Sequence, residues 1–251
     1  MTNAIPPFRT RYYFASAFKM FGAYPLQYIG IMILAALSGL LGRLPIMSRV
    51  FSYLVLQPLI TGIYSFAHNQ ATGEVPLFMD FFGAFSKKKY ISIVVISLFS
   101  TMAFMGILAL SAYVVFSDEF PALLKVREVL MDSSMQSPEA MENIAEFITN
   151  HIPNLMAIFL IASIAFIPVY FIVGYTGIHV IIKNEGLMPA AKAALTIIKS
   201  APAQVVGFVL FSYMIIALGF ALCGVGAIIA FPIVNIAFVM AFIDLDNRPK
   251  A

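Results

Sequence analysis

Charged side chains are scarce in this sequence. Aspartate, glutamate, lysine and arginine together make up 11% of its 251 residues, whereas 61% of the residues are hydrophobic and the mean hydropathy is +0.95. A water-soluble domain is about one quarter charged, and it needs polar side chains to cover its surface. The composition therefore excludes a water-soluble globular domain and predicts a protein embedded in a membrane.

The groups that many enzyme and metal sites require are also missing. The single cysteine, Cys223, excludes an internal disulfide and a cysteine-based zinc site. His68, His151 and His179 are far apart in sequence, and the chain has no HExxH, CxxC, GxSxG or P-loop motif. The net charge is only +3, and Lys87–Lys89 is the one basic cluster. We therefore expect no enzyme activity, no metal, no cofactor and no nucleic-acid partner.

Long uncharged runs take the place of these groups. The last run, Ser200 to Ile243, has 44 residues without a charge. As one helix it would be about 66 Å long, roughly twice the thickness of a bilayer's hydrocarbon core. We predict a helical hairpin that turns at Gly224-Val225-Gly226, because glycine accepts a positive φ. For the whole chain, residues 1–251, the same reasoning predicts one all-α polytopic membrane domain with six transmembrane helices paired as three hairpins: 20–42, 50–67, 90–117, 155–182, 203–223 and 226–243.

The three predicted hairpins share a layout. Pro25-Leu-Gln-Tyr-Ile-Gly30 matches Pro202-Ala-Gln-Val-Val-Gly207, and each leads into an outward-going helix. All three units start on the same side, so the repeats are predicted to be parallel. Each unit is also expected to begin with a short amphipathic helix in the inner headgroup layer. The apolar stripes of these helices are Phe14, Ala17, Phe18 and Phe21; Phe78, Phe81, Phe82 and Phe85; and Ala191, Ala194, Leu195 and Ile198.

The lysines and arginines predict the orientation. With both termini inside, the inner connections hold eleven of them and the outer connections four. Because cytoplasmic loops are enriched in these residues, we expect both termini in the cytoplasm. The connection 118–154 then becomes an acidic extracytoplasmic loop, expected to be helical in two pieces, with a helix start at Ser137-Pro138-Glu139.

Eight positions within or at the edge of the predicted membrane helices are candidates for function. The prolines among them are expected to kink their helices, either shaping a central cavity or, as we favour, in a purely structural role. The polar side chains are expected to form hydrogen bonds across the bundle, a role that needs no ligand. All twelve carboxylates lie outside the predicted helices, which disfavours a proton-relay mechanism. The eight residues are Gln27, Gln57, Pro58, Thr61, Pro168, His179, Pro232 and Asn235.

Two stretches carry a resemblance to a known family. Residues 56–85 contain Pro-Leu-x-x-Gly followed by Gly-x-x-Pro-x-x-x-Asp-x-Phe-x-x-Phe, and Gly224 to Asp244 forms the second stretch. The chain resembles uncharacterised bacterial six-helix inner-membrane proteins, which are similar to the membrane domain fused to some glycerophosphodiester phosphodiesterases. The resemblance implies the six-helix fold, a bacterial inner membrane and a loose link to lipids. It carries no catalytic residues, and no phosphodiesterase domain is present in this chain.

Two hypotheses for function follow. The first is a non-enzymatic envelope component that binds membrane lipids, or other membrane proteins or its own copies, through its helices. The alternative is a transporter or channel for a small neutral or amphipathic solute, lined by kinked helices with Thr61 and Asn235 three residues beyond a proline.

Overall fold

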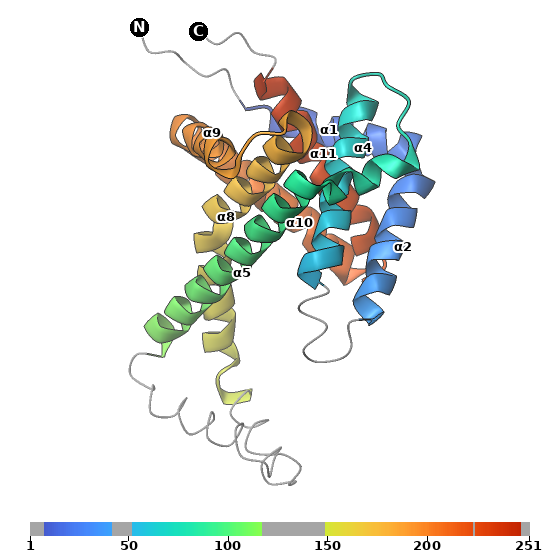
Figure 1. Ribbon diagram of the computed structural model, residues 1–251. Helices are drawn as coiled ribbons and strands as arrows, with labels where there is room; N and C mark the ends of the chain where they lie inside the picture. Colours follow the sequence, from blue (N-terminus) through green and yellow to red (C-terminus); the bar gives the residue numbers. More distant parts are fainter. Residues whose placement is uncertain (1–7, 42–51, 117–148, 223, 247–251) are drawn as a thin grey trace, which may run out of the picture. The chain divides into compact units, whose positions relative to one another are not determined.

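The computed structural model describes residues 8–41, 52–116, 149–222 and 224–246, and all regular structure in these ranges is helical (Figure 1). This confirms the all-α class. The described residues form two compact units, one from residues 1–100 with 167–251 and one from residues 101–166. Most of the expected extracytoplasmic loop, 118–154, lies outside the described residues.

The described part of the chain contains ten helical elements. In order they are α1 (Thr10–Ala23), α2 (Pro25–Leu41), the π-helical turn η1 (Ser52–Leu56), α4 (Gln57–Ala71), the 3-10 helix η2 (Phe78–Phe85), α5 (Lys87–Val115), α8 (Ile152–Lys183), α9 (Leu187–Ser200), α10 (Pro202–Ala221) and α11 (Ala227–Asp246).

Four of these helices, α5, α8, α10 and α11, are long and apolar enough to cross a membrane. A fifth is counted if α1 and α2 are taken together, although they meet at an angle of 91°. The predicted first helix, 20–42, therefore has the wrong start, because residues 20–23 belong to α1. Pro25 explains the break, since a proline has no amide hydrogen and disfavours helical geometry in the residue before it. Tyr24 accordingly has φ −134° and ψ 51°.

The last helix, α11, forms the centre of the larger unit. It packs against α1, α2, α4 and α10 (Figure 1). In its most apolar 18-residue window 61% of the residues are buried, against 11% in α5. Aromatic rings fill this centre, with Phe238 4.8 Å from Phe208 between ring centroids. Burial of such large apolar side chains makes α11 the helix on which the others assemble.

The turn between α10 and α11 lies where the glycines predict it. Gly224 has φ +76°, a conformation that favours glycine. The two helices touch through backbone beside the turn. A Cβ added to Gly219 would lie 2.9 Å from the carbonyl oxygen of Gly226, and a Cβ added to Gly226 would lie 2.7 Å from that of Gly219. The predicted helical hairpin is confirmed. Its close packing depends on the absence of a Cβ at Gly219 and at Gly226.

The motif behind the family resemblance also has a structural basis. Gly73 has φ +84° and turns the chain after α4. The Asp80 carboxylate accepts a hydrogen bond of 2.8 Å from the Leu77 amide and so closes the start of η2. The backbone of η2 lies directly on Gly62, and Phe81 stacks on Phe66 at 4.3 Å. This segment was expected to be an amphipathic helix, and the structure gives it 3-10 geometry with Phe81 buried.

The other two amphipathic helices bury a narrower stripe than the sequence predicts. In α1 the buried residues are Tyr13, Phe14 and Ala17, whereas Phe18 is 52% exposed. In α9 they are Ala190, Ala194 and Ile197, and Leu195 is exposed. The physical reason is that each helix packs mainly on one neighbour, α11 or α10, so only the side chains facing that neighbour are covered.

The smaller unit contains the end of α5 and the start of α8. Phe104 lies 5.2 Å from Phe166, and Phe116 lies 5.7 Å from His151, between ring centroids. Large apolar side chains of both segments, such as Met105 and Phe159, are exposed. Such surfaces suit contact with lipid rather than water.

Candidate functional site

The polar residues that follow prolines form hydrogen bonds within their own helices. The Thr61 hydroxyl donates to the carbonyl of Gln57 at 2.9 Å, and the Asn235 amide donates to the carbonyl of Phe231 at 2.8 Å. In both cases the acceptor is the residue just before the proline. The expectation that Thr61 and Asn235 bond across the bundle is therefore wrong for these contacts, because a side chain at position i reaches its own i−4 carbonyl first.

Pro58 is stabilised by a contact that the sequence did not reveal. A proline provides no amide for the carbonyl four residues earlier, which here belongs to Leu54. The hydroxyl of Tyr90, at the start of α5, donates to that carbonyl at 2.9 Å. Pro58 itself is buried in the first turn of α4, directly after the π-helical turn. The carbonyl that Pro58 leaves without an amide donor thus receives a hydrogen bond from a side chain of a neighbouring helix.

The other candidate positions do not converge on one site. Pro232 is buried inside α11, whereas Pro168 is exposed on α8. Gln27 on α2 and Gln57 on α4 are half-buried. None of these four residues lines either of the two grooves described below.

His179 is buried near the end of α8. Its ring lies 4.9 Å from Tyr175 and 5.0 Å from Phe242 of α11. Its Nδ1 is 2.8 Å from the Glu185 carboxylate, just beyond the helix. The other ring nitrogen, Nε2, is buried and has no hydrogen-bond partner among the described residues. His179 therefore contacts a carboxylate in the connection after its own helix, and not a partner across the bundle as expected.

Two aspartates at the end of α11 hold other segments in place. Asp244 accepts hydrogen bonds from Arg9 at 3.2 Å and from the Tyr13 hydroxyl at 2.6 Å, and Asp246 pairs with Lys183. The sequence shows only that these carboxylates follow the last apolar run. Their partners are 235, 231 and 63 residues away along the chain, so no local pattern could identify them.

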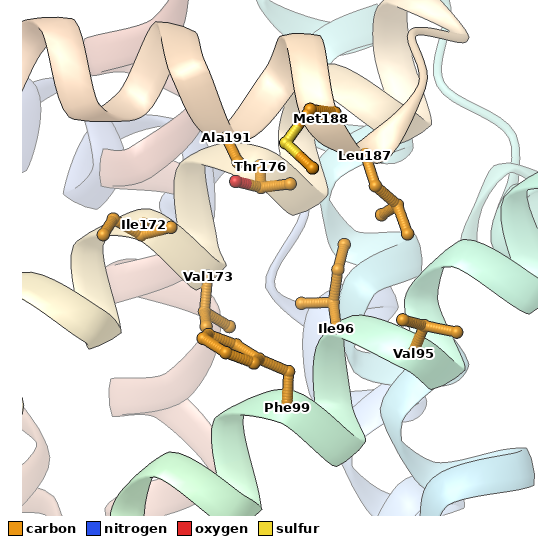
Figure 2. Close-up of a pocket in the computed structure, with 9 residues that line it drawn as sticks. All are labelled: Val95, Ile96, Phe99, Ile172, Val173, Thr176, Leu187, Met188 and Ala191. Carbon is orange, nitrogen blue, oxygen red and sulfur yellow. The ribbon is translucent and has the colours of Figure 1, made fainter.

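An apolar groove is formed by α5, α8 and α9 (Figure 2). We call it the α5/α8/α9 groove. Its cavity volume is about 330 Å³, and three residues of each helix line it: Val95, Ile96 and Phe99; Ile172, Val173 and Thr176; Leu187, Met188 and Ala191. All nine belong to the larger unit. Small-molecule sites commonly measure about 300–1,000 Å³, so this groove can take a slender ligand.

Thr176 is the one lining residue with a polar side chain. It is 4% exposed, and its hydroxyl has no hydrogen-bond partner among the described residues. Other helical hydroxyls of the chain, those of Ser97, Ser212 and Thr196, donate to the carbonyl four residues earlier. A buried hydroxyl without a partner is unfavourable. The Thr176 hydroxyl is thus buried behind the groove wall, and the surface that the groove presents is apolar.

Two exposed lysines lie on helices that form the groove. Lys88 is exposed on α5, seven residues before Val95 and eleven before Phe99, and this spacing places the three on one face of the helix. Seven residues correspond to about 10 Å along the axis. Lys192, also exposed, follows the lining residue Ala191 on α9. Both lysines lie on the helices that form the groove walls.

Comparisons with known proteins provide no relative of this chain. No protein-family model matches it, and neither a curated protein nor a solved structure shows significant similarity to it. Within the described ranges, no three histidine, cysteine, aspartate or glutamate side chains come close enough to hold a metal ion. The α5/α8/α9 groove is therefore the candidate site on its geometry alone.

Proposed function

We propose that this protein is a non-enzymatic, multi-pass component of a bacterial inner membrane that binds a lipid acyl chain in the α5/α8/α9 groove. The groove carries the proposal, because its walls are apolar except for one threonine. An acyl chain gains free energy on such a surface and has no polar group of its own that would need a partner there. The four long apolar helices support the membrane location.

The charges around the groove favour an amphipathic occupant over a purely apolar one. Lys88 and Lys192 are exposed on two of the helices that form it, where they can face lipid headgroups. The neighbouring Lys89 is engaged instead, because its ammonium group donates to the carbonyl of Ile181 at 2.7 Å. A lipid would then place its chain against Phe99 and its headgroup toward the lysines. Other membrane proteins, or a second copy of the chain, are secondary partners under this proposal.

The distribution of lysine and arginine supports an orientation with both termini in the cytoplasm. The transporter alternative has less support. It depended on Thr61 and Asn235 being available to a solute, and both donate to carbonyls of their own helices.

The absence of tryptophan from the sequence permits a direct test. The variant Phe99→Trp places the only indole of the protein in the groove. We expect its fluorescence in detergent to be quenched in a saturable manner by a phospholipid with brominated acyl chains. The added substitution Ala191→Phe, which fills the groove, should abolish the saturable phase.

Two matched controls accompany this measurement. Phe220→Trp places the indole at an exposed position of α10 outside the groove, and Ala217→Phe adds the same bulk to an exposed position of α10. Equal, non-saturating quenching of Phe99→Trp and Phe220→Trp would show that the lipid contacts only the general apolar surface, and the proposed function would be abandoned.

A further inference from the structure

A second groove, which shares no residue with the first, lies between α1 and α10. Its cavity volume is about 560 Å³, and it is lined by Thr10, Arg11, Phe14, Ala15, Phe18 and Phe211. We call it the α1/α10 groove. All of its residues belong to the larger unit. It combines exposed aromatic rings with an arginine, whereas the first groove has no charged lining residue.

The helical spacing of α1 produces this arrangement. Because α1 buries Tyr13, Phe14 and Ala17, the residues at i, i+4 and i+7 from Arg11 lie on the adjoining, exposed side. Phe18 is 52% exposed, and Phe211 is 40% exposed. The ring of Phe14 meets that of Phe211 edge to face at 4.7 Å and forms the base of the groove.

The two arginines at the start of α1 differ in their partners. Arg9 pairs with Asp244 at 3.2 Å, and its guanidinium lies 5.7 Å from the ring of Tyr12. No ion pair or hydrogen bond involves the guanidinium of Arg11 among the residues that the structure describes. No carboxylate lines the groove. Arg11 therefore provides a positive charge at the edge of an apolar surface, with no neutralising partner in the part of the chain that the structure describes.

We propose that the α1/α10 groove binds an anionic phospholipid, with the phosphate on Arg11 and an acyl chain over Phe18 and Phe211. A planar guanidinium can bind two phosphate oxygens at once. Phe211 lies nine residues into α10, about 13 Å from its first residue, so the aromatic surface continues from α1 along α10. The 91° angle between α1 and α2 places α1 along the membrane surface if α2 crosses it. The inference relies on the membrane location in the proposed function and not on the α5/α8/α9 groove.

The test compares lipid binding by the full chain in detergent, measured by native mass spectrometry. The probes are phosphatidylglycerol and phosphatidylcholine with identical acyl chains. Removing one basic charge near a membrane surface costs about fivefold in binding. We therefore expect Arg11→Gln to weaken phosphatidylglycerol binding about fivefold. Phosphatidylcholine binding should weaken less, because the choline cation already offsets the charge of its phosphate. Lys19→Gln is the matched control, because Lys19 is exposed on the same helix outside the groove.

Three further arms identify the source of the phosphate, the role of the groove and the role of the guanidinium. Glycerol phosphate, which has the headgroup chemistry without the chains, should not displace phosphatidylglycerol at equal concentration. Ala15→Phe should weaken binding of both lipids, because its ring fills the groove. Arg11→Lys should restore part of the preference for phosphatidylglycerol, because it keeps the charge and loses the planar fork.

Three results would overturn the inference: equal losses in Arg11→Gln and Lys19→Gln, no loss in Ala15→Phe, or full competition by glycerol phosphate. The first indicates general attraction to surface charge, the second excludes the groove, and the third indicates a free-phosphate site. Failure of the Phe99→Trp quenching experiment would leave these measurements unaffected, so the two proposals fail separately.

Discussion

Replacing Gly62 with alanine should separate η2 from α4. A Cβ on Gly62 would lie 1.7 Å from the carbonyl oxygen of Phe81 and 2.6 Å from its carbonyl carbon. A carbon and a carbonyl oxygen approach to about 3.3 Å at closest, so η2 must retreat by roughly 1.6 Å. The atoms in the way are backbone, so no rotamer change of a side chain can relieve the clash.

The free-energy cost of this displacement comes from the contacts of Phe81. Phe81 is fully buried and stacks on Phe66 at 4.3 Å with ring planes 9° apart. Overpacking in a core costs about 1–3 kcal/mol, and losing a buried phenylalanine costs about 3–5 kcal/mol. We expect Gly62→Ala to destabilise the protein by about 3 kcal/mol, which corresponds to a fall of about 6–12 °C in the melting temperature.

The assay is thermal unfolding of the purified protein in detergent. Gly207→Ala is the matched control, because no atom lies within 4 Å of a Cβ added to Gly207, and alanine at a helical position costs less than glycine by about 0.5–1 kcal/mol. Adding Phe81→Ala to Gly62→Ala should lower the melting temperature little further, because the stacking of Phe81 on Phe66 is already lost in Gly62→Ala. A Gly62→Ala protein that melts within about 1 °C of the unmodified protein would refute this account of the contact.

Three shorter predictions concern other parts of the chain. Tyr90→Phe removes the donor to the Leu54 carbonyl and should cost about 1 kcal/mol, whereas Tyr12→Phe, at an exposed position, should leave the melting temperature unchanged. Burial lowers the pKa of His68, more than Asn69 and Glu74 raise it. As the pH is lowered, the His68 imidazole therefore becomes protonated in the unfolded chain before it does so in the folded one. The free energy of unfolding should consequently fall as the pH drops below about 6.5. His68→Gln should flatten that dependence in melting curves recorded across this pH range. A reporter enzyme fused near Ser134 should be active only outside the cytoplasm, and cytoplasmic activity would reverse the proposed orientation.

Local patterns identified the helices of the last third of the chain well. The uncharged stretch Ser200 to Ile243 is longer than a bilayer requires, and both α10 and α11 begin within it, on either side of Gly224. Hydropathy and the backbone freedom of glycine are properties of neighbouring residues, so the sequence reveals them directly. The first predicted helix failed at Pro25 for a related reason, because the apolar run continues through a residue that changes the chain's direction.

The sequence by itself thus determined the helical class, the membrane character and the glycine turn of the last hairpin. Only the tertiary structure decided which side chains share a surface. Thr176 and Phe99 line one groove although they are 77 residues apart in the sequence. Arg9 pairs with Asp244, whereas Arg11 lines a groove together with Phe211. Helical periodicity gives the faces of each helix, but the rotation of one helix against another depends on packing between distant residues. Both grooves therefore became visible only when the helices were assembled.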